Sequence, residues 1–366
     1  MYVLNTQKQA FQIELNNQNP PTKLRGIGHN SQDNLITGGV GFLIQKDSLG
    51  WSLNQQLGIP GLLHNALGIY ADTSGLWVGL DEGVLLHYPP THDQAQSYRS
   101  CKPYTTGVLW QPYRSKNSQI WVGASNGLFH LDDKQLIPFD SSSTDLDGVA
   151  IYAFHDNKQG TWLSTSTGLY LVDLDKKIIL DHFSSALSDK NYIPTRHIAH
   201  LHEDKKGIFW LATKGDGLIR WNPKTKTYKQ YTQKGTGLSH NVLYSVYGDD
   251  FGSLWLSSQR GLMRFNKKSE HVNIYLEEDG LPHNEFNTIS HYQAADGRLY
   301  FGGQSGMIHF HPKDWQKTSV NAPFIITGYK KQTQDTLVNL TAKLIADHTI
   351  TLAPSDKSFS LNFALL

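Results

Sequence analysis

The sequence predicts an all-β protein: a seven-bladed β-propeller of four-stranded antiparallel blades, followed by a truncated β-sandwich-like segment. The main observation is a repeat in which an aromatic residue precedes an aliphatic and a small residue, with a Gly downstream, at spacings of 44, 41, 48, 45 and 45 residues. The composition, with 32 Gly, 11% aromatic and only 18% charged residues, favours strands joined by polar turns. No long stretch has a helical period of 3.6 residues, so we expect little helix.

Each copy of the repeat has the length and turn pattern of one propeller blade. Around Trp210, four short apolar or alternating runs are separated by Gly, Asp, Asn and Lys, as expected for four strands joined by hairpins. A degenerate copy near Ile36 keeps its glycines, lacks the Trp and lies in phase with the others. We expect the repeated aromatic residue on the second strand of each blade, filling the space between blades. The clear copies centre on Trp77, Trp121, Trp162, Trp210, Trp255 and Tyr300.

The two ends of the repeat array indicate how the ring closes. The last copy supplies three strands, around His291, Tyr300 and Ile308, and then turns away at Pro312. The segment Ala10–Leu15 reads as a spare fourth strand at the other end of the chain, so we expect it to complete the last blade. The predicted organisation is a partial repeat with third and fourth strands at 1–15, a propeller at 16–312, a linker at 313–321 and a truncated domain at 322–366.

The repeat, with Asp, Gly, Leu and Trp at fixed places before Gly-Leu, resembles the two-component regulator propeller repeat. The combination of Gly280–Asn287, Asp296–Gly303 and Met307–Pro312 resembles the last propeller blade before a three-tyrosine (Y_Y_Y) domain. Ala322–Tyr329 and Ser358–Ala364 then resemble a first and a later strand of that domain.

This resemblance implies a sensor region of a hybrid two-component or related membrane signalling receptor. The implied place is periplasmic or otherwise extracytoplasmic, in a membrane-anchored parent. The implied partners are an upstream propeller and a downstream domain of that parent, and a homodimer is a further option. The output of the parent would be a histidine kinase or another signalling domain.

Charge and cysteine content exclude several other classes. Lys and Arg number 33 against 32 Asp and Glu, which gives no electrostatic argument for nucleic acid. Cys101 is the only cysteine, so neither an intramolecular disulfide nor a cysteine-based zinc site is expected. Met1–Ala10 has no signal-peptide pattern and no run of 18 apolar residues occurs, so this segment is expected neither to carry an export signal nor to insert into a membrane.

Metal and catalytic patterns are weak. The group His197, His200 and His202 and the pair His309 and His311 read as polar strand residues rather than ligand sets. The Asp or Asn before each repeated Trp reads as a turn cap rather than a calcium ligand. No nucleophile elbow, phosphate loop or His-Glu-x-x-His motif is present. We therefore expect no catalytic residue, metal or cofactor in this chain.

A ligand is expected where the loops before the innermost strands converge on the mouth of the central channel. Their side chains offer hydrogen bonds suited to a small polar ligand such as an oligosaccharide, although Asn in these loops could instead cap turns. The candidate ligand-binding residues are His64, Asn65, Thr106, Arg196, His240, Asn241, His283 and Asn284.

Two other functions stay open at this point. A propeller glycan lyase or hydrolase would need a cluster of acid, base or Tyr groups at one channel mouth, which these loops do not supply. A protein-interaction scaffold of the WD-repeat kind would carry Trp-Asp pairs, but none of the nine Trp is followed by Asp.

Overall fold

The computed structural model describes residues 11–15, 23–30, 34–39, 41–55, 65–90, 95–100, 107–139, 146–187, 189–316, 324–333, 336–347 and 349–365. The chain forms two compact units, Met1–Trp315 and Gln316–Leu366, which are described separately. Their boundary falls inside the segment expected to be a linker, 313–321.

The first unit consists of sheets in which neighbouring strands are antiparallel, with one exception described below. Four of these sheets have four consecutive strands each: β2 (Gly26–His29), β3 (Leu35–Gly39), β4 (Phe42–Asp47) and β5 (Gly50–Gln55); β14 (Ile151–Asn157), β15 (Gly160–Thr165), β16 (Leu169–Asp173) and β17 (Ile178–Phe183); β18 (Ile198–Glu203), β19 (Phe209–Thr213), β20 (Leu218–Trp221) and β21 (Tyr228–Tyr231); and β22 (Leu243–Gly248), β23 (Ser253–Ser258), β24 (Leu262–Asn266) and β25 (Val272–Tyr275).

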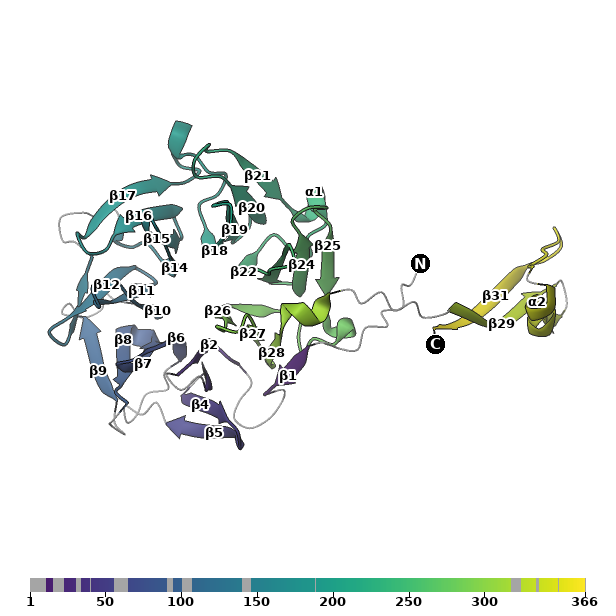
Figure 1. Ribbon diagram of the computed structural model, residues 1–366, viewed down its shortest axis with the longest axis horizontal. Helices are drawn as coiled ribbons and strands as arrows, with labels where there is room; N and C mark the ends of the chain where they lie inside the picture. Colours follow the sequence, from purple (N-terminus) through teal and green to yellow (C-terminus); the bar gives the residue numbers. More distant parts are fainter. Residues whose placement is uncertain are drawn as a thin grey trace. The chain divides into compact units, whose positions relative to one another are not determined.

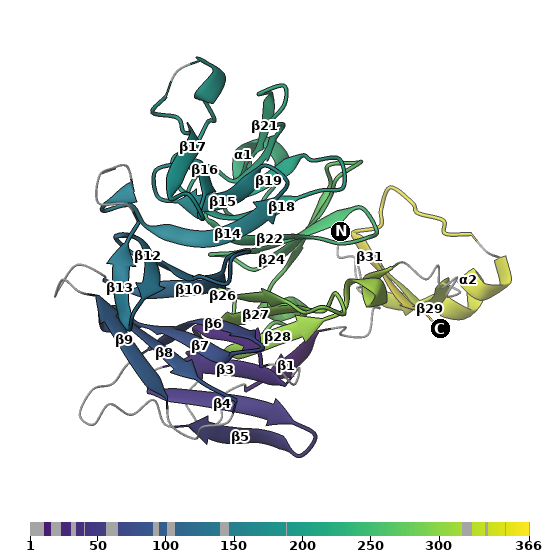
Figure 2. The same ribbon diagram turned by 60° about the vertical axis from the view of Figure 1, so that its left-hand side comes forward.

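The remaining strands of this unit form one larger sheet and one sheet that joins the chain's two ends. The larger sheet has eight strands in the order β10-β11-β12-β13-β9-β8-β7-β6, with β13 and β9 paired in parallel, and Figure 2 shows β13 between β12 and β9. Its strands are β6 (Ala66–Asp72), β7 (Gly75–Leu80), β8 (Val84–Tyr88), β9 (Gln96–Ser100), β10 (Leu109–Arg114), β11 (Ile120–Ala124), β12 (Gly127–Asp132) and β13 (Gln135–Pro138). The sheet that joins the ends has the order β1-β28-β27-β26, with β1 (Gln12–Glu14), β26 (Phe286–Gln293), β27 (Leu299–Gly303) and β28 (Gly306–Phe310).

The sheets are arranged in a ring (Figure 1). The innermost strands contact one another in the closed circuit β2, β6, β10, β14, β18, β22, β26 and back to β2. The predicted all-β propeller is therefore confirmed. The helical segments described in this unit are single turns: η1 (Asp81–Gly83), η3 (Asp189–Asn191), α1 (Gln233–Thr236), η4 (Glu277–Asp279) and η5 (Pro312–Trp315).

The repeated aromatic residues occupy equivalent places, as the repeat predicts. All six lie on the second strand of their sheets, each opposite a Tyr or His of the innermost strand, for example Trp255 opposite Tyr247. Trp121, Trp162 and Trp255 are at most 1% exposed. In the first sheet Ile36 takes this place on β3 and is fully buried. A smaller apolar side chain thus fills the space there.

The Asp residues before two of these Trp hold the turn and the indole together. Asp249 accepts the backbone N–H of Phe251 and Ser253 with Oδ1, and the indole N–H of Trp255 with Oδ2 at 3.1 Å. Asp204 does the same for its own turn and for Trp210. Both oxygens are used, so turn capping, the role expected from the sequence, is confirmed at these positions.

The ring closes as predicted, through a short strand from the beginning of the chain. β1 pairs antiparallel with β28 and so takes the place of the fourth strand that the last repeat lacks, with Gln12 opposite His309 and Glu14 opposite Met307. The third strand expected from Tyr2–Asn5 lies outside the described residues.

Phe11 anchors this closing strand in an aromatic cluster. Its ring lies 4.5 Å from that of Trp315 and 5.3 Å from that of Phe310, measured between ring centroids. Trp315 also packs against Trp255 at 5.4 Å, and its carbonyl accepts a hydrogen bond from Arg264. The closing strand and the end of the propeller are therefore buried in one apolar core.

Glu14 connects the closing strand to the first sheet. Its carboxylate lies against His309 of β28 and accepts hydrogen bonds from Lys46 of β4 and the indole N–H of Trp51 of β5. Burial alone would raise the pKa of Glu14, but these hydrogen bonds outweigh burial and lower the pKa to about 2. The carboxylate is therefore ionised at neutral pH.

The second unit contains a three-stranded sheet and one helix. β29 (Phe324–Gln332) lies between β30 (Leu337–Asn339) and β31 (Ser358–Leu365), and α2 (Thr341–Asp347) contacts β29. The two segments expected to be strands of a three-tyrosine domain thus overlap β29 and β31, while the assignment to that domain stays a prediction. Among the described residues, no helix is both long and apolar enough to cross a bilayer.

Replacing Phe11 by Ala should loosen the ring closure. Phe11 is only 7% exposed, and deleting a buried Phe side chain costs about 3–5 kcal/mol. We expect the free energy of unfolding, measured by urea titration, to fall by this order. Ile13→Ala is the matched control because Ile13 lies in the same strand but is 41% exposed. Equal effects of both changes would contradict the role of the aromatic cluster.

Replacing Asp249 by Asn should weaken one blade, because the amide keeps a single oxygen for both the turn and the indole. A buried donor without a partner costs about 1–3 kcal/mol, so we expect a loss of about 1–2 kcal/mol in unfolding free energy. Asp250→Asn changes the same charge at the neighbouring residue, which pairs with the exposed Lys205. The effect of Asp249→Asn should exceed that of the control by at least about 1 kcal/mol.

Candidate functional site

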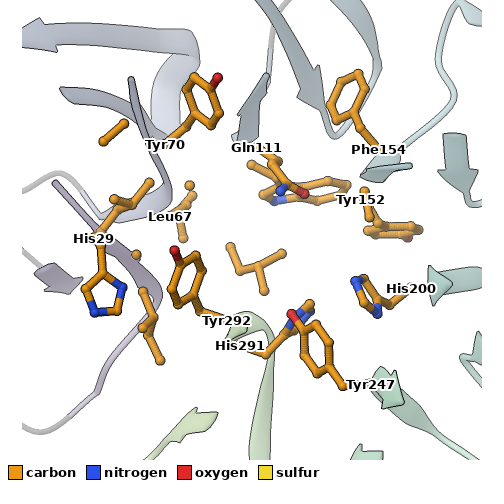
Figure 3. A pocket seen from close by; sticks show the side chains of 18 residues that line it. His29, Leu67, Tyr70, Gln111, Tyr152, Phe154, His200, Tyr247, His291 and Tyr292 are labelled. Atoms are coloured by element: carbon orange, nitrogen blue, oxygen red, sulfur yellow. The ribbon is translucent and has the colours of Figure 1, made fainter. Parts of the chain in front are cut away.

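A cavity of about 250 Å³ lies in the central channel, between the innermost strands. Aromatic and imidazole side chains from β2, β6, β10, β14, β18, β22 and β26 form its wall (Figure 3). The described residues that line it include no Asp, Glu, Lys or Arg. The chief polar and aromatic lining residues are His29, Tyr70, Trp110, Gln111, Tyr152, His200, Tyr247, His291 and Tyr292.

β-bulges help to direct side chains into this cavity. The pairing of the innermost with the second strand shifts register after the first residue of β6, β10, β14, β18 and β22. A bulge leaves one residue unpaired and re-aims its side chain. In β6, β10 and β14 the residues between the shifted pairs are Leu67, Trp110 and Tyr152, and all three line the cavity. The rings of Trp110 and Tyr152 stack at 4.7 Å with an interplanar angle of 13°.

A Tyr and two His side chains form a polar cluster on one side of the cavity, opposite His29 and Tyr292 (Figure 3). The Tyr247 hydroxyl lies 2.7 Å from His291 Nδ1. His200 Nδ1 donates to the carbonyl of Val246 at 3.0 Å, and the His200 and His291 rings meet edge to face at 4.7 Å. The rings are thus held by their neighbours before any ligand arrives.

This cluster is uncharged at neutral pH. Burial lowers the pKa of His291 to about 4 and, together with the nearby His291 and His202 imidazoles, holds the pKa of His200 well below its usual range. Burial also raises the pKa of the Tyr247 phenol well above its ordinary value. The cavity therefore presents neutral hydrogen-bonding groups and aromatic faces. Among the described residues, no group of three His, Cys, Asp or Glu side chains is placed to hold a metal ion.

The structure gives three of the predicted Asn residues bracing roles in the loops before the innermost strands. Asn241 Oδ1 accepts the backbone N–H of Gln233 at 2.7 Å, and Asn284 Oδ1 accepts that of Glu277 at 2.9 Å. Asn65 donates both its backbone N–H and its amide to the carboxylate of Asp81. These bonds fit the turn-capping alternative, and ligand contact by these residues stays a prediction.

The predicted His residues also make local contacts. His240 Nδ1 accepts the backbone N–H of Val242 at 3.0 Å. His283 is only 5% exposed, and its Nε2 donates to the carbonyl of Gly306. His64 and Thr106 lie outside the described residues.

Among the predicted residues that the structure describes, Arg196 is the one whose side chain is exposed. It precedes His197, which is also exposed. Burial, Lys214 and Arg196 lower the pKa of His197, in that order. Positive charges thus gather at this part of the mouth.

The residues that line the channel were not among those predicted. They lie along the innermost strands rather than in the loops. The bulges that direct three of them into the cavity depend on how two strands pair, which the sequence of one strand does not show. One signal was available in the sequence: aligning the repeats on their aromatic residues places Tyr or His seven or eight residues earlier in each clear copy, as at Tyr70, Tyr247 and Tyr292.

Comparison with known proteins finds no matching family model. Among curated proteins, the chain is similar to histidine kinase P4 of Formosa agariphila, with 29% identity over 221 residues that make up 58% of this chain and 16% of that protein. Among solved structures, an extracellular domain assigned to a hybrid two-component system of B. thetaiotaomicron matches with a TM-score of 0.73 and 19% identity, over 98% of this chain and 49% of that chain.

The fold is also shared with an enzyme. A catalytically inactive virginiamycin B lyase from Staphylococcus aureus matches with a TM-score of 0.62 and 12% identity, over 82% of this chain and 98% of that chain. At these identities the solved structures show the fold alone.

The comparisons confirm the predicted resemblance to sensor regions of two-component systems, although they do not extend it to a three-tyrosine domain. The chain spans about half of the two-component structure and 16% of the histidine kinase.

His291 should stay neutral well below the pH at which an ordinary imidazole is protonated. Its pKa of about 4 predicts an unchanged ring carbon–proton NMR shift between pH 8 and 5.5. The unfolded chain binds this proton near pH 6.5, so stability is lost as pH falls from about 6.5 to 4, by about 2 kcal/mol at pH 5. His291→Gln should remove that part of the pH dependence. Titration of His291 near pH 6.5 would instead show that water fills the cavity.

Proposed function

We propose that the chain is the ligand-sensing region of a two-component signalling receptor, placed outside the cytoplasm. The observation that carries this proposal is the similarity to a histidine kinase over 221 residues, because a propeller fold alone occurs with many functions. Counting the eight-stranded sheet as two blades joined by β13 and β9 gives the seven-bladed ring proposed for the sensor. The extracellular origin of the two-component structure supports the periplasmic location.

The proposed ligand is a carbohydrate bound in the channel. A saccharide offers apolar C–H faces for aromatic rings and hydroxyls for neutral donors and acceptors. Trp110 and Tyr152 would supply the aromatic wall, and Gln111, Tyr292 and His291 the polar contacts. Trp110 and Tyr152 are held by stacking on each other, and His291 by its contact with Tyr247, before binding, which reduces the entropy lost on association.

An enzymatic role is the second candidate, because Tyr247 and His291 form a phenol–imidazole pair in the channel. A glycan lyase could use such a pair as base and acid. The raised pKa of Tyr247 disfavours the phenolate that such a base requires. No carboxylate stands among the described lining residues to serve a hydrolase. We therefore favour binding without turnover.

The proposed partners belong to the parent receptor. An upstream propeller and a downstream domain of the same chain would complete the sensing assembly, and a homodimer would carry the signal. The parent would also supply the membrane anchor and the signalling output.

Calorimetry with a panel of defined oligosaccharides, combined with product analysis, tests the proposal. We expect heat of binding for at least one saccharide without any product. Trp110→Ala should weaken that binding at least about tenfold, a loss of about 1.4 kcal/mol. Tyr228→Ala is the control because Tyr228 is an aromatic residue on the outer strand β21 and is 45% exposed. Turnover would support the enzyme instead, and the absence of binding across the panel would refute a carbohydrate ligand.

A further inference from the structure

One blade departs from the others at the residue four places after the repeated aromatic. This residue hydrogen-bonds through its backbone to the loop before the innermost strand: the N–H groups of Ser125, Ser166, Lys214 and Gln259 donate to the carbonyls of Val108, Ala150, His197 and Val242. The position therefore lies at the same mouth of the channel in each of these blades.

In two of these blades the side chain at this position also holds the loop by a hydrogen bond. Ser125 Oγ accepts the backbone N–H of Val108 at 3.0 Å, and Ser166 Oγ accepts that of Ala150 at 3.0 Å. Lys214 cannot do this, because an ammonium group has no acceptor. This blade therefore carries a cation where Ser125, Ser166 and Gln259 carry neutral side chains.

The ammonium group of Lys214 points across to the neighbouring blade. Its Nζ lies 3.8 Å from the centroid of the Tyr152 ring, which stacks on Trp110 and forms part of the cavity wall. Burial lowers the pKa of Lys214 to about 8. Within the described part of the chain Lys214 forms no ion pair. The free-energy cost of removing water from this ammonium group is thus offset by the face of an aromatic ring and not by a carboxylate.

Two further positive or protonatable side chains lie beside it. Arg196 and His197 are exposed in the loop before β18, and both Lys214 and Arg196 act on the pKa of His197. The carboxylate of this region, Asp216, accepts a hydrogen bond from Thr195 Oγ1 at 2.8 Å. The charge at this part of the rim is therefore positive.

We propose that Lys214, with Arg196, binds an anionic group of the ligand at the rim of the channel. The sensor's ligand is then an acidic saccharide, whose carboxylate or sulfate meets the ammonium group while its ring lies toward Trp110. This inference rests on the proposed sensor function and makes its ligand class specific. An anion at this place would supply the electrostatic stabilisation that the ammonium group of Lys214 loses with its water on burial, and charge-assisted hydrogen bonds are among the strong ones.

The test compares three saccharide probes of equal length by calorimetry: trigalacturonate, its carboxyl-reduced neutral trimer and a sulfated neutral trimer. A non-sugar carboxylate, 4-hydroxybenzoate, is the fourth probe. The variants are Lys214→Gln, which introduces the side chain that Gln259 carries at the same repeat position, and Lys214→Arg, which keeps the charge. Lys205→Gln is the control for net charge, because Lys205 is exposed and pairs with Asp250.

We expect an acidic trimer to bind at least about tenfold more tightly than the neutral one. Lys214→Gln should abolish this difference, and Lys214→Arg and Lys205→Gln should retain it. The carboxylate and sulfate arms show which anionic group is recognised.

Other results overturn one proposal or both. Equal binding of acidic and neutral trimers, or no effect of Lys214→Gln, would overturn the anion site and leave a sensor of neutral sugars. Binding of 4-hydroxybenzoate alone, with dependence on Lys214, would keep the anion site and overturn the carbohydrate ligand. The absence of binding by all four probes would overturn both.

Discussion

A ring of sheets holds only if its first and last sheets are joined, and in this chain a three-residue strand makes that joint. β1 supplies few backbone hydrogen bonds, so its side chains must add to the closure. Phe11 enters an aromatic core with Trp315, and Glu14 reaches both the last and the first sheet. A buried aromatic side chain and a charged side chain thus add to the short backbone pairing at this seam.

The fold was predictable because its unit is repeated. A period near 44 residues, four short runs per period and one large aromatic side chain per period are local features, and six copies average out the ambiguity of each one. The closing strand was also predictable, since the last repeat lacked one strand and the beginning of the chain offered one. The parallel pairing of β13 with β9 was not, because it depends on how two neighbouring sheets lean together and no local pattern encodes it.

The site was predictable only in outline. The central channel follows from the propeller, but the polar side chains of the loops that converge on it make hydrogen bonds within their own loops, as Asn241 and Asn284 show. The channel-lining Trp110 and Tyr152 depend on bulges, whose position is set by the pairing of two strands and not by either strand alone. Arg196 was identified from its loop, whereas Lys214 stands out only when backbone-equivalent residues of the blades are compared.

Charge is distributed in this propeller according to the cost of desolvation. Inside the channel, burial keeps His200 and His291 neutral, so the cavity can exclude water without leaving an unpaired charge. At the rim, where solvent still reaches Arg196, a cation can be kept at a modest cost, and the face of Tyr152 offsets part of it for Lys214. A neutral channel would favour ligands by their shape and hydrogen-bonding groups, and a positively charged rim would favour ligands that carry an anionic group. A single ligand would meet both the channel and the rim if it extended from Trp110 across the Tyr152 ring to Lys214.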